Sequence, residues 1–107
     1  MKRTLFILAT AALAFSLPGH AKGNYEAGKA KSAACAACHG ENGVSTVPSF
    51  PKLAGQERDY LYHALRDYQS GKRSNPIMAE QVKGLSDQDL LDLSLYYSKQ
   101  KGLYLKY

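Results

Sequence analysis

The chain has 107 residues and a formal net charge of +5, with acidic and basic side chains interspersed along it. This length allows one small domain, and the mild, unclustered charge excludes the basic stripe of a nucleic-acid-binding protein. A domain of this size often needs a covalent staple or a cofactor to complete its core.

The first 21 residues have the three regions of a secretory signal peptide. Lys2 and Arg3 precede the apolar run LFILATAALAFSL, which a Pro-Gly pair ends, and GHA then places small residues at a cleavage site. An apolar run of 13 residues is too short to cross the roughly 30 Å hydrocarbon core of a membrane as a helix. We therefore expect cleavage after Ala21, which lowers the formal charge to +3 and leaves residues 22–107 in the periplasm, an oxidising compartment.

A first helix is predicted from the N-cap residue Asn24 through Cys35. Gly28 and Ser32 lie four residues apart on one face of this helix. Their small size would allow another helix to cross closely at that point. No stretch of the sequence alternates in the manner of a strand between hairpin turns, so the chain is predicted to be all-α.

Two more helices are predicted, over residues 56–70 and from Ser86 to about residue 101. Gly71 and Gly102 follow their last residues, as helix-ending glycines do. Ser86 is a natural N-cap, with an acidic residue three positions later as in a capping box. The apolar stripes of the two helices are Leu61, Ala64, Leu65 and Tyr68 in the first, and Leu90, Leu93 and Tyr97, with Ser94 between them, in the second.

Two loops of about 15 residues, over 40–55 and 71–85, separate the predicted helices. Loops of this length are uncommon in a small domain unless they serve a function. The second loop contains Pro76, which stiffens the approach to Met78, the only methionine after residue 21.

The motif Cys-Ala-Ala-Cys-His, from Cys35 to His39, has the pattern of c-type haem attachment. The two intervening residues let a single turn of backbone present both thiols to the vinyl groups on one porphyrin edge, with the histidine beneath the ring. A redox disulfide is less favoured because no βαβ setting is predicted around the cysteines. A structural zinc site requires four ligands, and residues 22–107 contain two cysteines and two histidines.

A haem iron would need a sixth ligand or would keep an open position, and the candidates are Met78 and His63. On the predicted helix over 56–70, His63 lies roughly opposite the apolar stripe and is expected to face solvent. Met78 is therefore the predicted ligand, although methionine more often fills gaps in a core.

The stretches CAACHGENG, PSFPKLAGQ, LRDYQSGKRSNPIM and LSDQDLLDLSLYY follow one another as in class I cytochromes c. The chain most resembles one haem domain of bacterial cytochrome c4, and is similar to the related small cytochromes c553 and c5. The resemblance covers essentially all of residues 22–107. It implies a small cytochrome c fold, with three main helices and long loops wrapped around one covalent haem c.

The resemblance also implies the roles of individual residues. Cys35 and Cys38 would carry the thioether links, and His39 and Met78 would be the axial ligands of the iron. Pro48, with Pro51 as the alternative, would offer its carbonyl to the Nδ1–H of the ligand histidine. Gly28 would meet the aromatic pair Tyr96 and Tyr97 on the last helix, and helical periodicity independently places Tyr97 on the inward face of that helix.

The sequence departs from cytochrome c4 because it holds one such domain where that protein has two. It ends in KGLYLKY, an apolar tail that we expect to fold back on the domain or to dock on a partner or a second copy of the chain.

The expected function is single-electron transfer between respiratory redox partners, which are donor and acceptor cytochromes, oxidases or reductases. Neither catalysis nor a small-molecule or nucleic-acid ligand is expected. One rival is an enzyme or sensor in which Met78 leaves the iron, and another is a haem subunit of a larger complex, which the tail favours. The expected apolar shell of the haem consists of Leu53, Leu61, Leu65, Ile77, Met78 and Leu90.

Overall fold

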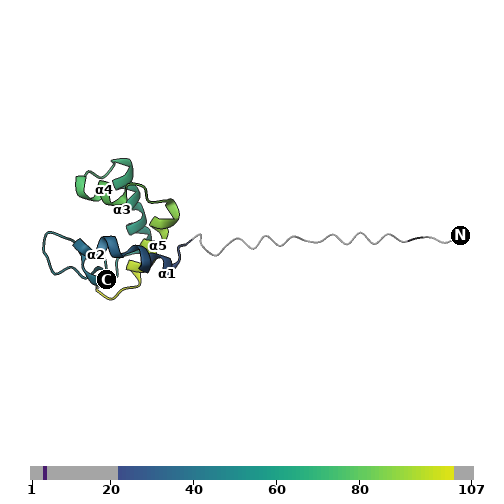
Figure 1. Ribbon diagram of the computed structural model, residues 1–107, viewed down its shortest axis with the longest axis horizontal. Helices are drawn as coiled ribbons and strands as arrows, with labels where there is room; N and C mark the ends of the chain where they lie inside the picture. The colour runs from purple at the N-terminus through teal and green to yellow at the C-terminus, as the bar shows by residue number, and fades with distance from the viewer. Residues whose placement is uncertain (1–3, 5–21, 103–107) are drawn as a thin grey trace.

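The computed structural model describes residue 4 and residues 22–102. Within that part the chain forms the helices α1 (Tyr25–Lys31), α2 (Ala33–His39), α3 (Arg58–Ser70), α4 (Pro76–Val82) and α5 (Asp87–Ser98), together with a 3₁₀ turn over Glu41–Gly43 (Figure 1). The prediction of an all-α fold is confirmed. The expected signal peptide, apart from residue 4, and the tail over 103–107 lie outside the described residues. Among those described, no helix is long and apolar enough to cross a membrane.

Side chains that cap the helices explain where α1 and α5 begin. The Asn24 side chain accepts a hydrogen bond of 2.9 Å from the N–H of Ala27 at the start of α1. At the start of α5, the Asp89 N–H donates to the Ser86 hydroxyl at 3.0 Å, and the Ser86 N–H donates to the Asp89 carboxylate at 2.9 Å. This confirms the predicted capping box. Gly71, with a φ of 84°, ends α3 as predicted.

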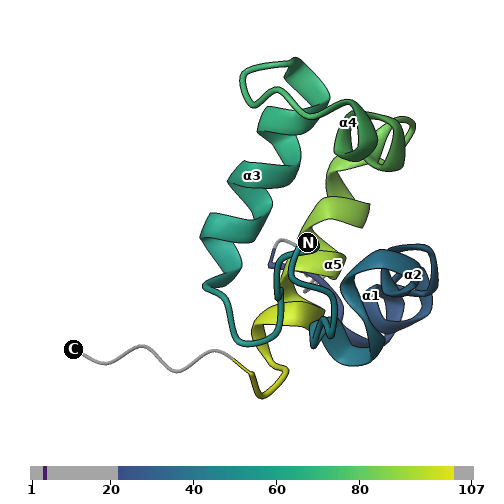
Figure 2. The same cartoon turned by 90° about the vertical axis from the view of Figure 1, so that its left-hand side faces the viewer.

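The last helix, α5, lies at the centre of the fold and packs against both α1 and α3 (Figure 2). Gly28 is the crossing point with α1, because a Cβ at this position would lie 2.9 Å from the Tyr96 Cβ and would overlap the Asp92 carbonyl. The expected contact of Gly28 with Tyr96 is thus confirmed. Tyr97 is directed about 100° further around the helix, and its hydroxyl lies 3.5 Å from the Ser32 carbonyl oxygen.

An ion pair between a buried carboxylate and a partly exposed lysine also fixes α1 to α5. The Asp92 side chain is 3% exposed and accepts hydrogen bonds from the Asn24 N–H at 2.7 Å, the Lys31 ammonium at 2.6 Å and the Gln88 amide at 2.8 Å. Burial raises the pKa of Asp92, but these donors together hold it below its ordinary value. Lys31 also pairs with Asp89 at 2.7 Å.

The predicted loop over residues 71–85 contains a helix, α4. The Asn75 side chain accepts hydrogen bonds from the N–H groups of Ile77 and Met78, at 3.0 and 3.1 Å. Proline at the next position suits the first turn of a helix, where its missing N–H would have no intrahelical partner. The dipeptide Asn-Pro is therefore a helix start here, and the loop interpretation was wrong for residues 76–82.

The first predicted helix is divided into two, and it also extends further than expected. Ser32 separates α1 from α2, and its hydroxyl donates to the Lys29 carbonyl at 2.7 Å. Residues 33–39 then form α2, which carries the whole cysteine–histidine motif on one short helix. Cys35 packs against the buried cluster of Leu61, Leu93, Tyr96 and Tyr97, which anchors the motif to the core.

Candidate functional site

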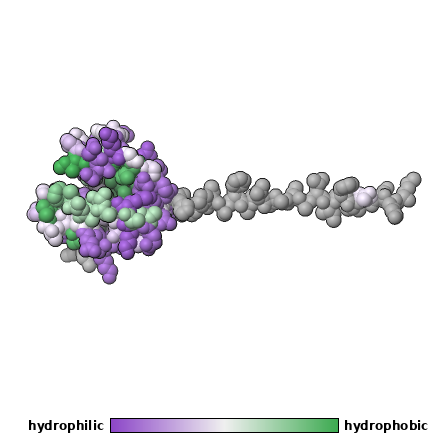
Figure 3. Space-filling model, in the orientation of Figure 1, coloured by the Kyte–Doolittle hydropathy of each residue, from purple (hydrophilic) through white to green (hydrophobic). Residues whose placement is uncertain are grey.

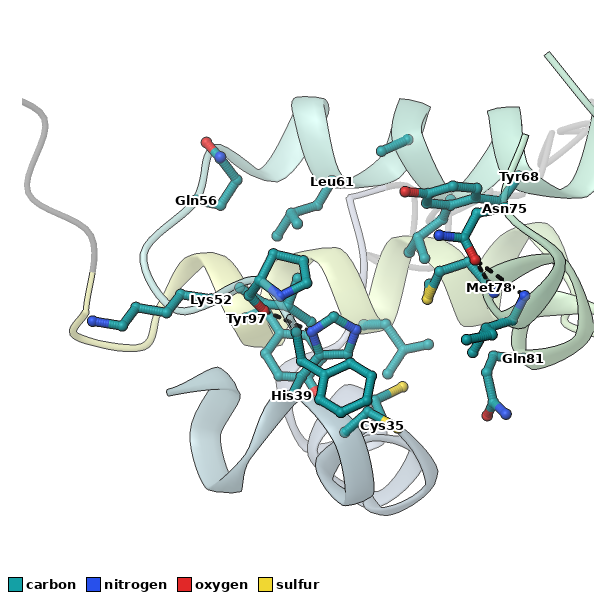
Figure 4. A pocket seen from close by; sticks show the side chains of 18 of the residues that line it. Cys35, His39, Lys52, Gln56, Leu61, Tyr68, Asn75, Met78, Gln81 and Tyr97 are labelled. Atoms are coloured by element: carbon teal, nitrogen blue, oxygen red, sulfur yellow. Dashed lines mark hydrogen bonds between the residues drawn. The ribbon is translucent and has the colours of Figure 1, made fainter. Parts of the chain in front are cut away.

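A cavity of about 280 Å³ lies between α2, α3, α4 and α5 and the segment over 49–56. All four residues of the predicted apolar stripe of α3, from Leu61 to Tyr68, line it, which confirms that this face is turned inward. The apolar part of its wall includes Leu53, Leu61, Leu65, Ile77, Met78 and Leu93. Figure 4 shows the side chains that surround this space.

Both cysteines of the motif line the cavity from α2. Because they are three residues apart in a helix, Cys35 and Cys38 lie on neighbouring positions of one face. Both are half-buried and neither is in a disulfide. Burial raises the pKa of the Cys35 thiol above its ordinary value. The pair therefore presents two thiols to the same edge of the cavity.

His39, the last residue of α2, is 6% exposed, and its ring lies in the cavity wall. Its Nδ1 is 2.7 Å from the Pro51 carbonyl oxygen (Figure 4). A carbonyl oxygen only accepts hydrogen bonds, so Nδ1 carries the proton and donates. In the neutral imidazole the other ring nitrogen, Nε2, then keeps its lone pair free to bind a metal.

The structure corrects the expectation that Pro48 supplies this carbonyl. Pro48 does not line the cavity, whereas Pro51, the alternative, lines it and its carbonyl oxygen accepts the hydrogen bond from His39. The physical reason is the backbone that follows Pro51, because the N–H groups of Leu53 and Ala54 both donate to the Gly43 carbonyl, at 2.9 and 3.2 Å. These two hydrogen bonds hold residues 51–54 next to the turn that follows α2. The Pro51 carbonyl therefore lies beside His39 at the end of α2.

Met78 enters the cavity from α4, on the side opposite His39 (Figure 4). Its backbone N–H is bonded to the Asn75 cap, so the same capping group that starts α4 also places this residue. His63 is exposed and does not line the cavity, as the helical spacing predicted. The two sulfur atoms of the motif, an imidazole and a thioether therefore surround one apolar space.

The predicted shell is confirmed except for Leu90. Leu53, Leu61, Leu65, Ile77 and Met78 line the cavity, whereas Leu90 is buried elsewhere in the core and Leu93, one turn further along α5, takes its place. Sequence reasoning missed most of the polar residues in the wall, because loop residues and single polar positions follow no periodic pattern. These are Gln56, Tyr60, Arg73, Asn75 and Gln81.

The residues of the cavity fit a covalently held haem. The thiols lie at one edge, the free imidazole nitrogen and the thioether sulfur approach from opposite sides, and aliphatic side chains form most of the remaining wall. One buried hydroxyl in this wall, Ser94 Oγ, finds no hydrogen-bond partner within the described part of the chain. An orphaned polar atom of this kind indicates a space that is completed by another group.

Comparison with known proteins points the same way. The family model for cytochrome c matches residues 25–100. Cytochrome c4 of Pseudomonas aeruginosa is 45% identical over 97 residues, which cover 89% of this chain and 48% of that protein. The thiosulfate dehydrogenase electron acceptor of Thiomonas intermedia is 34% identical over 102 residues, which cover 94% of this chain and 45% of that protein.

The crystal structure of reduced recombinant cytochrome c4 from Pseudomonas stutzeri matches with a TM-score of 0.72 and 44% identity, over 76% of this chain and 47% of that one. The chain thus spans about half the length of these relatives. With the motif, the cavity and the all-helical fold in agreement, the chain belongs to the cytochrome c family and takes one covalent haem c through its Cys35/Cys38 motif.

Proposed function

We propose that this chain is an exported monohaem cytochrome that carries single electrons between respiratory redox proteins in the periplasm. The observation that carries the proposal is the approach of His39 and Met78 to one cavity from opposite sides, beside Cys35 and Cys38. When bound, the haem supplies a one-electron couple between ferric and ferrous iron.

The side chains of this domain would hold that group rigidly in both oxidation states. Cys35 packs against the core cluster, so thioether links from Cys35 and Cys38 would hold one edge of the haem, and the bond to Pro51 fixes the His39 ring. The Asn75 cap holds the turn that carries Met78. A methionine ligand and an apolar wall both favour the ferrous state, because sulfur is a soft ligand and the ferric state carries the extra charge.

The proposed docking face for redox partners is the outer surface of α2. Ala33, Ala34 and Ala37 are exposed there, next to the two cysteines. Figure 3, which has the orientation of Figure 1, shows a pale green band over the region of α2, bordered by hydrophilic residues. A small apolar patch with a polar rim suits a weak, transient contact of the kind that an electron carrier needs.

A spectroscopic experiment tests the ligand assignment. The exported protein is expected to give a low-spin c-type spectrum with a weak red sulfur-to-iron band, and Met78→Ala is expected to abolish that band. His63→Ala is the matched control, because His63 is exposed and lies outside the cavity wall. A high-spin wild-type spectrum, or one that Met78→Ala leaves unchanged, would favour an enzyme or sensor over an electron carrier.

Export is tested separately, by N-terminal sequencing of the haem protein from the periplasmic fraction. Cleavage after Ala21 predicts that the first residue is Lys22. A haem protein that retains residues 1–21 would contradict this proposal without affecting the ligand assignment.

A dehydrogenase is the electron donor that we propose first, because one relative is named as the electron acceptor of thiosulfate dehydrogenase. The test mixes the oxidised cytochrome with a purified thiosulfate dehydrogenase and thiosulfate, and follows reduction at the ferrous absorption bands. Reduction within seconds at micromolar protein would support this donor. Reduction no faster than in the sample without the dehydrogenase would exclude it.

A further inference from the structure

The hydroxyl of Ser94 is a buried polar group without a hydrogen-bond partner in the described part of the chain. Ser94 lies on α5 with 0% of its surface exposed, and it lines the cavity between Leu93 and Tyr97. A buried hydroxyl without a partner is disfavoured, because it loses its bonds to water and gains none in return.

Two ordinary explanations for a buried serine fail at this position. A serine within a helix usually donates to the carbonyl four residues earlier, which here belongs to Leu90, and that bond is not made. Close packing of helices explains a small residue, but alanine would pack as closely without an orphaned hydroxyl and is the better helix former. The oxygen atom therefore requires a reason that lies within the cavity.

We propose that Ser94 lowers the reduction potential of the haem by directing its hydroxyl dipole toward the haem iron. This inference rests on the proposed electron-carrier function. The ferric state holds one more positive charge than the ferrous state. A hydroxyl with no fixed partner rotates about its C–O bond at little cost, so its hydrogen can turn away from that charge and leave the oxygen lone pairs directed toward it. Ser94 thus stabilises the ferric state and lowers the potential relative to an apolar side chain.

Burial is what makes this single dipole effective. Charge–dipole interactions inside a protein are weakly screened, whereas those at the surface are damped by water and salt. The cationic residues of the cavity wall, Lys52 and Arg73, are both exposed, so their influence on the iron is screened. Leu93 and Tyr97, the cavity-lining residues on either side of Ser94 along α5, carry no charge, and the Tyr97 hydroxyl is directed to the Ser32 carbonyl.

The test compares the midpoint potentials of the haem-loaded wild type, Ser94→Ala and Ser98→Ala by spectroelectrochemistry. Ser98 is the matched control, because it lies on the same helix but already donates to the Leu95 carbonyl at 2.8 Å. At a fixed ambient potential, Ser94→Ala is expected to raise the ratio of reduced to oxidised protein about two- to tenfold. A tenfold rise corresponds to about 59 mV for a one-electron couple. Ser98→Ala is expected to change the ratio by less than about twofold.

A second variant and a second measurement keep the test decisive. Ser94→Cys nearly preserves the volume but weakens the dipole, so it should shift the ratio in the same direction by a smaller factor. Denaturant unfolding of both oxidation states should show that Ser94→Ala favours the reduced form by the same factor as the electrochemical ratio. An unchanged or lowered potential in both Ser94 variants, with the sulfur-to-iron band intact, would overturn the inference and leave the carrier proposal standing. Absence of the sulfur-to-iron band from the wild-type spectrum would instead refute the carrier proposal.

Discussion

Replacing Asp92 by alanine is expected to lower the free energy of unfolding of the haem-loaded protein by about 3–5 kcal/mol, because three hydrogen bonds to a buried carboxylate are lost. The carboxylate is almost completely buried and accepts three hydrogen bonds, one of them from the Lys31 ammonium. Its removal leaves the Asn24 N–H and the Gln88 amide without this acceptor at the crossing of α1 and α5. A hydrogen bond to a charged group contributes more than one between neutral groups. The total loss for the three bonds is therefore in the upper range for single substitutions.

Lys31→Ala should cost less, about 1–2 kcal/mol, because it removes one of the three donors to the buried Asp92 carboxylate and leaves the other two in place. The Lys31 side chain is 32% exposed, so water screens its charge and replaces its bonds, and Asp92 keeps its two other donors. The asymmetry between the two variants is therefore the quantity to measure. Equilibrium unfolding in guanidinium chloride, followed by far-ultraviolet circular dichroism, gives both free energies at pH 7.

The pH dependence of the Asp92→Ala effect has a definite sign. The pKa of Asp92 is lowered in the folded protein from an ordinary value of 3.8, so its contribution is fully present above that value. It is lost as the pH falls through the folded pKa. The difference between wild type and Asp92→Ala should thus be constant from pH 7 to about 5 and should shrink below about pH 4. Visible spectra recorded in parallel separate this effect from any loss of axial ligation in acid.

Two results would refute this reasoning. One is a cost for Lys31→Ala that equals or exceeds that of Asp92→Ala, which would mean that the exposed ammonium dominates the network. The other is a difference that persists unchanged at low pH, which would mean that the effect is one of packing and not of charge.

Three further predictions concern the helix crossing, the ligand turn and the docking face. Gly28→Ala should destabilise the protein by about 1–3 kcal/mol in thermal unfolding, since the added Cβ meets Asp92 and Tyr96, whereas Lys29→Ala on the exposed side should be neutral. Asn75→Ala removes the cap of the turn that carries Met78, which is worth about 1 kcal/mol. Because added imidazole competes with Met78 for the iron, its affinity for the ferric protein should rise about fivefold in a spectral titration. An unchanged affinity would show that the cap does not restrain Met78. Ala37→Asp should slow electron exchange with a redox partner in stopped-flow mixing while the potential stays constant, whereas Ala30→Asp on α1 should not, and equal slowing by both would argue against α2 as the docking face.

Local signals in the sequence identified much of this protein because each depends on a few neighbouring residues. The thiol–thiol–imidazole spacing of Cys35, Cys38 and His39 requires only one turn of helix, and the caps at Asn24 and Ser86 act within three residues. The stripe of α3 follows from helical periodicity, and it also placed His63 outside the cavity. The helix α4 was missed although its signal was local, because the proline of Asn75-Pro76 suggested a stiff loop and not the first turn of a helix.

Other features depended on contacts between distant parts of the chain, which no spacing rule contains. The partner of His39 is Pro51 and not Pro48, because the Gly43 carbonyl holds Leu53 and Ala54 beside α2. The sequence by itself determined the chemistry of the site, namely two thiols, an imidazole and a thioether. The tertiary structure decided which carbonyl orients the imidazole. It also decided that the buried hydroxyl of Ser94, in the cavity wall, has no partner in the described part of the chain. Both depend on how distant segments pack, because packing determines which polar groups in a core meet a hydrogen-bond partner.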